Sequence, residues 1–389
     1  MTDRTLVITN DFPPRAGGIQ SFVHGLVERQ PPGSMVVFAP KWSGSDSYDA
    51  GLDFPVVRYP HSVMLPTLGV ARRCREIARS HGCTRVLFGA TAPLGLLAGG
   101  LRRSGIERIV GITHGHEAAW ASTPGSREVI RRIGANTDTI TYLGDYTRNL
   151  LAKALDPQAA ARMRRLVPGV DAQTFSPALR PAGDQVRERY GLTGRQVIVC
   201  VSRLMPRKGQ DTLIHALPTI RRALPEAALL IVGGGPYRKK LDELVVSTNQ
   251  QADIVITGSV PFSELPAHYA AGEVFAMPCR TRNRGWDVEG LGIVYLEASS
   301  TGIPVVSGDS GGAPDAVVAG KTGCVVPGGS PVAVARPLIE LLSDPPKAEA
   351  MGAAGRAWIE SDWKWTTMAA RLESLLSGVD PDLITERPI

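Results

Sequence analysis

Short apolar runs rich in β-branched residues alternate with amphipathic segments along the whole chain. In the segment after the first run, Ile19, Phe22, Val23 and Leu26 recur at helical spacing. This alternation predicts βα units and therefore parallel sheets. The predicted strands are Leu6–Thr9, Met35–Ala39, Val56–Tyr59, Arg85–Phe88, Ile109–Thr113, Thr139–Tyr142, Gln196–Val201, Ala228–Val232, Ile254–Thr257, Val274–Met277 and Pro304–Ser307.

The strands form two series with a break between them. A turn signal at Pro168–Asp171 is followed by a proline-rich and glycine-containing loop, Phe175–Gly183. A chain of 389 residues is also long for one core and suits two domains. We therefore expect an α/β protein with two Rossmann-like domains, 1–168 and 169–362, facing across a cleft that is the default position for a site.

Composition supports a loop-rich α/β protein and adds one asymmetry. Hydrophobic residues make up 43% and charged residues 21% of the chain, with 42 Gly and 30 Pro. The net charge of +6 is uneven, because Met1–Pro168 holds 21 Lys and Arg against 13 Asp and Glu, and the remainder is slightly acidic. A basic first half suits nucleic acid, a membrane surface or a phosphorylated substrate, and it is equally explained by a solvated face.

Cysteine usage and hydropathy indicate the compartment. The five cysteines are widely spaced, with no Cys-x-x-Cys, which favours reduced thiols in a cytosolic protein. The N-terminus leads directly into the first strand without a signal peptide. The longest uncharged stretch, Val86–Leu101, falls short of the roughly 20 apolar residues that a spanning helix needs. We expect a cytoplasmic protein that meets a membrane only from outside the bilayer.

Two acidic residues eight positions apart, Glu289 and Glu297, bracket a candidate anion site. Between them, Leu291–Val294 is predicted to form the first turn of a buried helix, whose N–H groups and positive dipole end favour a diphosphate. Eight helical residues span about 12 Å. Two carboxylates so far apart are better placed to contact the two ends of a nucleotide sugar than to contact one atom. A helix-capping acid and an acid on the helix face are the alternative explanation.

Two cations lie just after the first strand of the second series. Arg203 and Lys208 occupy the loop Ser202–Gly209, at the carboxyl end of a strand, where open α/β sheets bind ligands. Both side chains are able to reach a diphosphate and stabilise the charge that it gains on leaving. Ordinary solvated loop charge is the alternative.

Two glycine-rich turns and one histidine pair complete the candidates. Gly17 and Gly18 follow the first strand and precede a helix, so the backbone there is able to approach a phosphate. An ordinary turn from strand to helix is the alternative. Gly233–Pro236 follows a strand of the second series, where a turn or close packing is the simpler explanation. His114 and His116 lack a third metal ligand nearby, so one imidazole or a carbonyl at a strand end is favoured over a metal site.

These segments in this order resemble the retaining glycosyltransferases of family 4, which have the GT-B fold. The resemblance covers nearly the whole chain. Within the family, Asn10–Pro14, Thr113–Glu117 and the loop Cys279–Glu289 are most similar to the actinobacterial phosphatidylinositol mannosyltransferases that add a second mannose. The segments that carry the family resemblance are Gly17–Gly18, Pro168–Asp171, Ser202–Gly209, Val232–Pro236, Glu289–Glu297 and Gly302–Val305.

The resemblance implies a role for each candidate residue. The donor is expected to be GDP-mannose and the acceptor a phosphatidylinositol mannoside lipid, with catalysis by His114, Arg203, Lys208 and Glu289, without a cofactor or a metal. The resemblance also implies an anionic membrane surface as a partner, a position on the inner face of the plasma membrane, and a C-terminal helix, 363–378, that crosses back to the first domain. Donor binding is expected from Arg203, Lys208, Gly258, Ser259, Val260, Glu289, Leu291, Gly292, Ile293 and Glu297, and acceptor binding from Asp11, Gly17, Gly18 and His114.

Other functions stay open on the sequence alone. A family 4 enzyme with another donor or acceptor is the main rival, because contacts to the base made by backbone groups leave little trace in sequence. A dehydrogenase is weakened by the missing dinucleotide fingerprint. A sensor would bind a sugar nucleotide without consuming it, and a nucleic-acid binder has only the basic first half in its favour.

Overall fold

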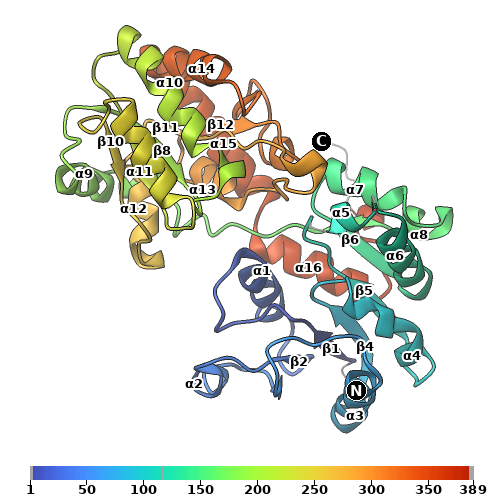
Figure 1. Ribbon diagram of the computed structural model, residues 1–389. Coiled ribbons are helices and arrows are strands. Elements are labelled where there is room, and N and C mark those ends of the chain that lie inside the picture. Colours follow the sequence, from blue (N-terminus) through green and yellow to red (C-terminus); the bar gives the residue numbers. More distant parts are fainter. Residues whose placement is uncertain (1–2, 116, 122, 385–389) are drawn as a thin grey trace. The chain divides into compact units, whose positions relative to one another are not determined.

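The computed structural model describes residues 3–115, 117–121 and 123–384. The chain divides into two compact units, each an α/β structure built on a parallel sheet (Figure 1). The first unit contains Met1–Gly169 and Trp365–Ile389, and the second contains Val170–Lys364. The first division lies one residue from the boundary expected at 168, and the second lies two residues from the one expected at 362.

The sheet of the first unit has seven parallel strands in the order β3-β2-β1-β4-β5-β6-β7. Because every strand runs the same way, the loops after the strands gather at one edge, the carboxyl edge. The opposite, amino edge is formed by the starts of the strands. The strands are β1 (Arg4–Ile8), β2 (Met35–Pro40), β3 (Val56–Tyr59), β4 (Cys83–Phe88), β5 (Arg108–Gly111), β6 (Thr139–Tyr142) and β7 (Arg164–Arg165).

Helix α16, near the end of the chain, belongs to the first unit, and Figure 1 shows it in red beside α1 and β5. Trp365, the first residue of α16, packs against two glycines. A Cβ on Gly25 would lie 2.5 Å from its indole, and a Cβ on Gly169 would lie equally close. The helices of this unit are α1 (Gly18–Val27), α2 (Ser45–Asp49), α3 (Leu68–His81), α4 (Ala98–Arg102), α5 (Glu117–Ala121), α6 (Pro124–Asn136), α7 (Asp145–Ala152), α8 (Pro157–Ala161), α16 (Trp365–Leu376) and α17 (Pro381–Ile384).

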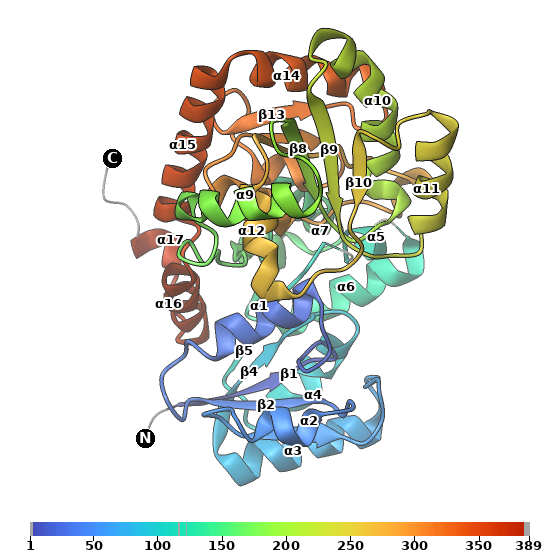
Figure 2. The same ribbon diagram turned by 90° about the vertical axis from the view of Figure 1, so that its left-hand side faces the viewer.

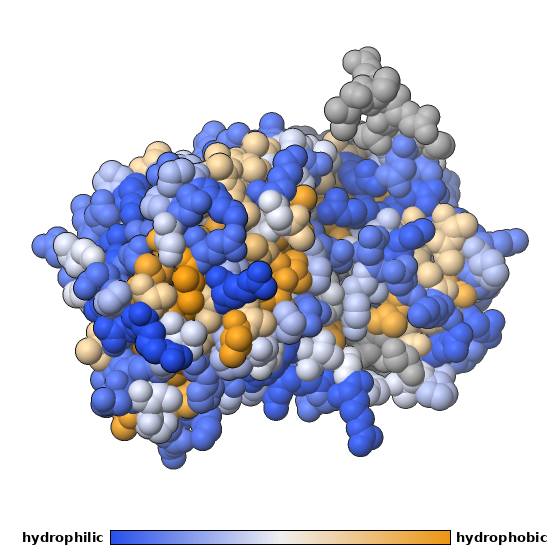
Figure 3. All heavy atoms as spheres, turned by 90° about the horizontal axis from the view of Figure 1, so that it is seen from above, coloured by the Kyte–Doolittle hydropathy of each residue, from blue (hydrophilic) through white to orange (hydrophobic). Residues whose placement is uncertain are grey.

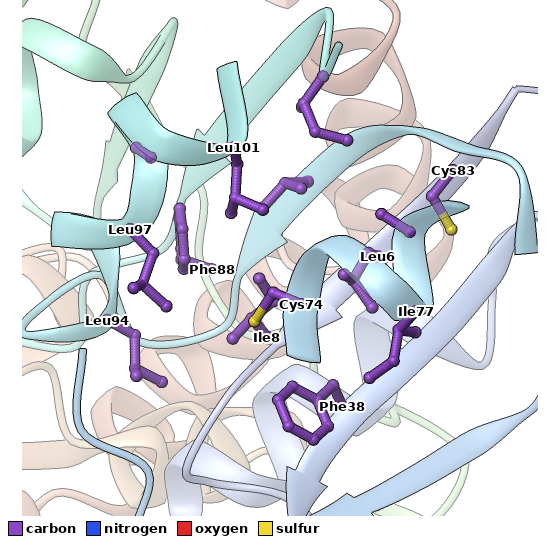
Figure 4. Close-up of a cluster of buried hydrophobic side chains, with 14 of the residues drawn as sticks. Leu6, Ile8, Phe38, Cys74, Ile77, Cys83, Phe88, Leu94, Leu97 and Leu101 are labelled. Atoms are coloured by element: carbon purple, nitrogen blue, oxygen red, sulfur yellow. The ribbon is translucent and has the colours of Figure 1, made fainter. Parts of the chain in front are cut away.

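A buried apolar cluster joins the sheet of the first unit to α3 and α4 (Figure 4). Leu6 and Ile8 alternate along β1, and Phe38 and Phe88 come from the neighbouring strands. Cys74 packs among them and is fully buried. Burial raises the pKa of its thiol to about 12, so Cys74 behaves as a small apolar side chain.

The second unit contains six parallel strands in the order β10-β9-β8-β11-β12-β13. Its central strands are apolar and buried throughout, as expected for a parallel sheet covered on both faces. The strands are β8 (Gln196–Val201), β9 (Ala227–Val232), β10 (Ile254–Ile256), β11 (Val274–Met277), β12 (Val305–Gly308) and β13 (Gly323–Val326).

Helices pack in groups on this second sheet. Figure 2 shows α10 and α11 along strands β9 and β10, and α10 also packs against α14. Helix α13 packs against α15, and α9 packs against α12. The helices are α9 (Arg180–Arg189), α10 (Gln210–Ala223), α11 (Arg238–Ser247), α12 (Leu265–Ala270), α13 (Ile293–Ser300), α14 (Pro331–Ser343) and α15 (Pro345–Asp362).

Hydrophilic residues cover most of the face in Figure 3, with apolar residues between them in small groups. Among the helices of the described residues, none is long and apolar enough to cross a membrane. Eleven of the strands lie where the sequence pattern predicts them, whereas β7 and β13 were not predicted. Strand β7 consists of two arginines and carries no apolar pattern, while β13 is a short run after a glycine-containing turn.

Candidate functional site

The carboxyl edge of the second unit brings together loops that are far apart in sequence. The N–H of Gly233, after β9, donates to the carbonyl of Gly258, after β10, at 2.9 Å. The N–H of Leu204, after β8, donates to the carbonyl of Gly234 at the same distance. Three neighbouring strands therefore end in one connected group of loops, which includes the predicted residues Arg203, Gly258, Ser259 and Val260.

Glycines allow these loops to approach one another closely. Gly233 has a φ of 143°, and a Cβ there would lie 2.1 Å from the carbonyl oxygen of Ser202. A Cβ on Gly234 would lie 2.3 Å from the hydroxyl of Ser259. The glycine-rich turn after β9 is therefore a packing element between two loops, which confirms the simpler explanation drawn from the sequence.

A buried ion pair links the loop after β8 to the loop after β11. The Nζ of Lys208 lies 2.7 Å from Oε2 of Glu289, and both side chains are about nine-tenths buried. The Nε of Arg207 lies 3.8 Å from the same oxygen and 3.7 Å from Oδ1 of Asp287. Glu289 is thus held between two cations, and the structure brings the predicted residues Lys208 and Glu289 into direct contact.

Backbone contacts fix the position of Glu289. Its N–H donates to the hydroxyl of Ser310 at 3.2 Å, and its carbonyl accepts from the N–H of Gly312 at 2.9 Å. A Cβ on Gly311, which has a φ of 56°, would lie 2.2 Å from that same carbonyl oxygen. The loop after β12 therefore holds Glu289 through glycines that permit close approach.

Helix α13 begins later than the sequence predicted. Leu291 and Gly292 precede it, and Ile293 is its first residue. Gly292 has a φ of 82°, a left-handed conformation that ends the preceding loop, whereas the expected first turn would need helical backbone there. Because Glu289 is not on the helix, the helical rise does not give its distance from Glu297. The estimate of about 12 Å assumed one continuous helix between the two residues, and that assumption is wrong.

The N-terminus of α13 retains the features expected of an anion site. It has no side-chain cap, and the first residues, Ile293 and Val294, are only partly buried. The N–H groups of a first helical turn have no acceptor within the helix. Their positive dipole end points toward the loop that carries Gly292, so a diphosphate would be stabilised there.

Glu297 lies on α13 and contacts a tyrosine from another element. The hydroxyl of Tyr269, on α12, donates to its Oε2 at 2.6 Å. Burial raises the pKa of Glu297 to about 7, although the hydrogen bond from Tyr269 lowers it. The same carboxylate, together with burial, raises the pKa of Tyr269 well above its ordinary value. Glu297 is therefore an acid that titrates near neutral pH.

Arg203 differs from Lys208 in being exposed, on the loop after β8. The carbonyl of Arg203 accepts from Nε2 of Gln210, which also donates to the hydroxyl of Ser202. The backbone of Arg203 is thus fixed while its side chain faces solvent. Such an arrangement leaves the guanidinium able to move toward an incoming anion.

A second charged cluster lies at this edge and was not predicted from the sequence. Arg280 forms a two-pronged ion pair with Asp211, at 2.9 and 2.7 Å, and donates to the hydroxyl of Thr212 at 2.8 Å. Its backbone N–H donates to the carbonyl of Arg207 at 2.8 Å. The hydroxyl of Tyr237 also donates to Asp211. This cluster fixes the loop that carries Lys208, and its long sequence separations give no signal in a single sequence.

The first unit places Asp11, Gly17 and Gly18 near one another at the carboxyl end of β1. Oδ1 of Asp11 accepts from Nε2 of Gln20, in the first turn of α1, at 2.8 Å. Gly17 precedes α1 in extended backbone, and Gly18 is its first residue. The helix has no side-chain cap. A Cβ on Gly18 would meet no atom within 4 Å, whereas one on Gly17 would lie 2.2 Å from Oε1 of Gln20.

His114 follows β5 at the same carboxyl edge. Its Nε2 lies 2.5 Å from the carbonyl of Gly89, and its backbone N–H donates to Glu117 at 2.9 Å. Phe22, on α1, packs edge-on against the imidazole. His114 is therefore positioned by three elements, whereas His116 lies outside the described residues. Within the part of the chain that the structure describes, no group of three potential metal ligands occurs.

Comparisons with known proteins agree with this geometry. Residues 184–358 match the family described as "Glycosyl transferases group 1". The chain is 50% identical to the GDP-mannose-dependent alpha-(1-6)-phosphatidylinositol monomannoside mannosyltransferase of Mycolicibacterium smegmatis, covering 96% of this chain and 98% of the relative. It is 49% identical to the protein of the same name from Mycobacterium tuberculosis H37Rv, covering 97% and 99%.

Solved structures share the fold at low identity. A structure of Anabaena HepE in complex with UDP gives a TM-score of 0.80 at 18% identity, covering 97% of this chain and 100% of that one. Sucrose-phosphate synthase from Thermosynechococcus elongatus gives 0.76 at 19% identity, covering 96% and 98%. The two parallel α/β units are those of a GT-B glycosyltransferase. The chain belongs to the group 1 glycosyltransferases, among relatives named as phosphatidylinositol monomannoside mannosyltransferases.

Proposed function

We propose that the protein transfers mannose from GDP-mannose to phosphatidylinositol monomannoside through an α-(1-6) linkage, adding the second mannose. The observation that carries this proposal is near-50% identity, over almost the full length, to two proteins with that name. A third relative, from Corynebacterium glutamicum, is 45% identical over 96% of this chain and is named for a monoacylated form of the same acceptor. The names of these relatives differ in that only the third specifies a monoacylated acceptor.

The donor diphosphate is assigned to Arg203, Lys208 and the N-terminus of α13. Lys208 now holds Glu289 at 2.7 Å, so an arriving diphosphate would compete with that carboxylate for the ammonium. Arg207 stays beside Glu289 and is able to balance its charge during the exchange. Glu289 would then accept hydrogen bonds from hydroxyl groups of the mannose. Binding of the diphosphate and binding of the sugar are coupled through this pair.

The nucleoside is assigned to the other side of the same edge. Glu297 would bind the ribose hydroxyls with an oxygen oriented by Tyr269. The backbone of Gly258–Val260 would contact the base, with Gly258 at a φ of 80°. Leu291, Gly292 and Ile293 would line the diphosphate with their backbone amides. Backbone contacts of this kind do not discriminate strongly among bases, so the choice of GDP rests on the relatives.

The acceptor is assigned to the first unit. The start of α1 at Gly17 and Gly18 offers uncapped N–H groups to the phosphate of an inositol lipid. Asp11 would accept from an acceptor hydroxyl, exchanging its bond to Gln20. His114 is assigned a position near the reacting carbon. The contact between Nε2 of His114 and the carbonyl of Gly89 holds the imidazole in place.

The reaction is proposed to retain anomeric configuration without an enzymatic nucleophile. The bond from the anomeric carbon to the diphosphate oxygen breaks, and the acceptor hydroxyl attacks from the same face and passes its proton to the departing diphosphate. The protein supplies position and charge, through Arg203, Lys208 and the dipole of α13, to the growing negative charge. These groups neutralise a diphosphate without a metal, so we propose that no metal is required. Unchanged turnover in EDTA supports this, and loss that a divalent ion restores would overturn it.

The enzyme is also proposed to act from the cytoplasmic face of an anionic membrane. Helix α3 exposes Arg72, Arg73 and Arg75 while burying Cys74. Leu68, at its start, is 90% exposed, which places an apolar side chain beside the basic ones. A basic and partly apolar surface suits a lipid interface. Arg102, another residue of the basic first half, is instead paired with Asp138 at 2.6 Å.

One assay tests the central proposal. Purified protein is incubated with radiolabelled GDP-mannose and phosphatidylinositol monomannoside, and the lipids are separated and digested with a linkage-specific α-mannosidase. A labelled dimannoside sensitive to an α-1,6-mannosidase is expected. Parallel reactions with UDP-glucose, and with acylated and unacylated acceptor, test the rival family 4 specificities. Donor binding without any labelled lipid would support a sensor and overturn the enzyme proposal.

A further inference from the structure

A small cavity rich in arginine lies at the amino edge of the first unit's sheet. Its volume is about 190 Å³. The first residues of β5, β6 and β7 line it, so it lies at the opposite edge of the sheet from Gly17, Gly18 and His114. The lining residues are Arg108, Asp138, Thr139, Arg162, Arg164, Leu375, Gly378, Val379 and Asp380.

Two of the three arginines at the cavity make few hydrogen bonds and no ion pair among the described residues. Within this described part of the chain, Arg162 donates only to the carbonyls of Gly134 and Thr137, both at 3.4 Å. Arg108 donates to the carbonyl of Leu375 at 2.9 Å and, at 3.4 Å, to the hydroxyl of Thr139. Among the described residues, neither guanidinium lies within 4.0 Å of a carboxylate. Each guanidinium has five N–H donors, so both retain hydrogen-bonding capacity at the cavity.

The two carboxylates at the cavity are already committed to other cations. Asp380 forms a two-pronged pair with Arg164, which lowers the pKa of Asp380 to about 2. Asp138 accepts from Arg102 at 2.6 Å and from the N–H of Ile109. The pKa of Arg108 is lowered, first by burial and then by the neighbouring arginines, including Arg102 and Arg162, against the opposing effect of Asp138. The cavity therefore holds an excess of positive charge.

We propose that this cavity binds a phosphate group, bridged by Arg108 and Arg162, either as inorganic phosphate or as the head of a phosphomonoester. Planar guanidinium groups match phosphate oxygens in pairs. A volume of about 190 Å³ is below the roughly 300–1,000 Å³ of pockets for drug-sized ligands. The site therefore takes a small anion or one end of a larger molecule. Asp380, on the turn before α17, neutralises the third arginine and competes with the anion.

The test measures phosphate binding by calorimetry and by the shift in Tm, at constant ionic strength with chloride as the comparison anion. Wild type, Arg162→Gln and Asp380→Asn are compared. Arg131→Gln is the matched control, because Arg131 lies on α6 of the same unit and pairs with Glu128 at the surface. Repeating the titration with Lys208→Ala separates this cavity from the loop cations of the second unit.

Arg162→Gln is expected to weaken phosphate binding about tenfold or more, since it removes a charge-assisted contact. Arg162→Lys should retain part of it, and Asp380→Asn should strengthen it. The Arg131→Gln control should bind phosphate as wild type does. In Lys208→Ala, the phosphate binding that Arg162→Gln removes should persist, whatever binding is lost at the loop after β8. In a second arm of the experiment, vesicles that contain phosphatidic acid replace free phosphate. If wild type binds these vesicles but not free phosphate, and Arg162→Gln loses vesicle binding, the ligand of the cavity is a lipid head group. Equal binding by wild type and Arg162→Gln in both arms would overturn the proposal and leave the arginines a structural role.

Discussion

The ion pair between Lys208 and Glu289 connects the loop after β8 with the loop after β11. The sequence placed Lys208 at the diphosphate, and the family resemblance implied Glu289 in donor binding and catalysis, but neither predicted that the two side chains touch. In the structure each is the partner of the other at 2.7 Å, in a buried environment. Removing one member of a buried pair leaves an uncompensated charge, which typically destabilises a protein by about 3–5 kcal/mol. Mutations here therefore need a stability measurement beside the kinetics.

Arg203→Ala gives the cleaner kinetic test, because the side chain is exposed. We expect kcat to fall by about 10² or more, since the guanidinium stabilises charge that grows as the diphosphate leaves, with Tm unchanged. Lys208→Ala should lower kcat similarly and also lower Tm. Lys239→Ala, at an exposed position on α11, is the control. Near-normal turnover of Arg203→Ala would remove it from the diphosphate site.

Glu297 offers a pH-dependent test. Its pKa is about 7 in the folded protein and 4.5 ordinarily, so the folded state binds the extra proton. This contribution to stability is fully present below pH 4.5 and is lost as pH rises through 7. Glu297→Gln, which keeps an acceptor for Tyr269, should raise Tm at pH 8 by about 2 °C or more. The effect should vanish near pH 4.5. Donor KM should rise in the variant, because a ribose contact is made in ground and transition states alike.

At the scale of elements, the strands were predictable because a buried parallel strand is a short apolar run bounded by turns. β8 and β9 are of this kind. β7 is two charged residues that join the edge through β6, and no pattern marks it. The start of α13 was misplaced for a different reason. In the sequence, Gly292 lies among apolar residues that were predicted to form the first turn of the helix. Its left-handed φ of 82° shows that the helix begins after it.

The loop after β12 provides a test at this scale. Gly312 has ordinary negative φ, and a Cβ there would lie 2.2 Å from the carbonyl of Gly290. Gly312→Ala should therefore displace the loop that carries Glu289 and lower kcat by about tenfold or more, because small misplacements at a reacting centre are costly. Gly125→Ala in α6 meets no atom within 4 Å and is the control. Equal kinetics for the two variants would show that the loop position is unimportant.

At the scale of the molecule, the basic residues that give the first half its positive charge include two groups, one paired with carboxylates at the sheet edge and one exposed on α3. Arg102, Arg85 and Arg164 form ion pairs at the amino edge of the first sheet and serve structure. Arg72 and Arg73 share Glu76 and stay exposed on α3. Charge counting predicted an anionic partner but could not separate these groups, because pairing depends on contacts between residues distant in sequence.

The last prediction concerns the exposed group on α3. If α3 meets an anionic leaflet, each basic residue contributes about 1 kcal/mol within a Debye length of roughly 10 Å at 0.1 M salt. Replacing Arg72, Arg73 and Arg75 by Ser should weaken binding to anionic vesicles by up to about 100-fold at low salt, and binding of wild type should fall steeply as salt rises. Donor affinity should stay unchanged.

Leu68→Ser separates the apolar contribution of this surface from the electrostatic one. It should weaken vesicle binding with little change in salt dependence, since the 90% exposed side chain would insert between lipids. Arg131→Ser with Arg132→Ser, exposed on α6 of the same unit, is the matched control and should bind as wild type does. Vesicle co-sedimentation measures all of these. If vesicle binding by wild type does not depend on salt, and if the α3 variants bind as tightly as wild type, α3 is excluded as the membrane-binding surface. Its arginines would then be ordinary solvent-exposed residues.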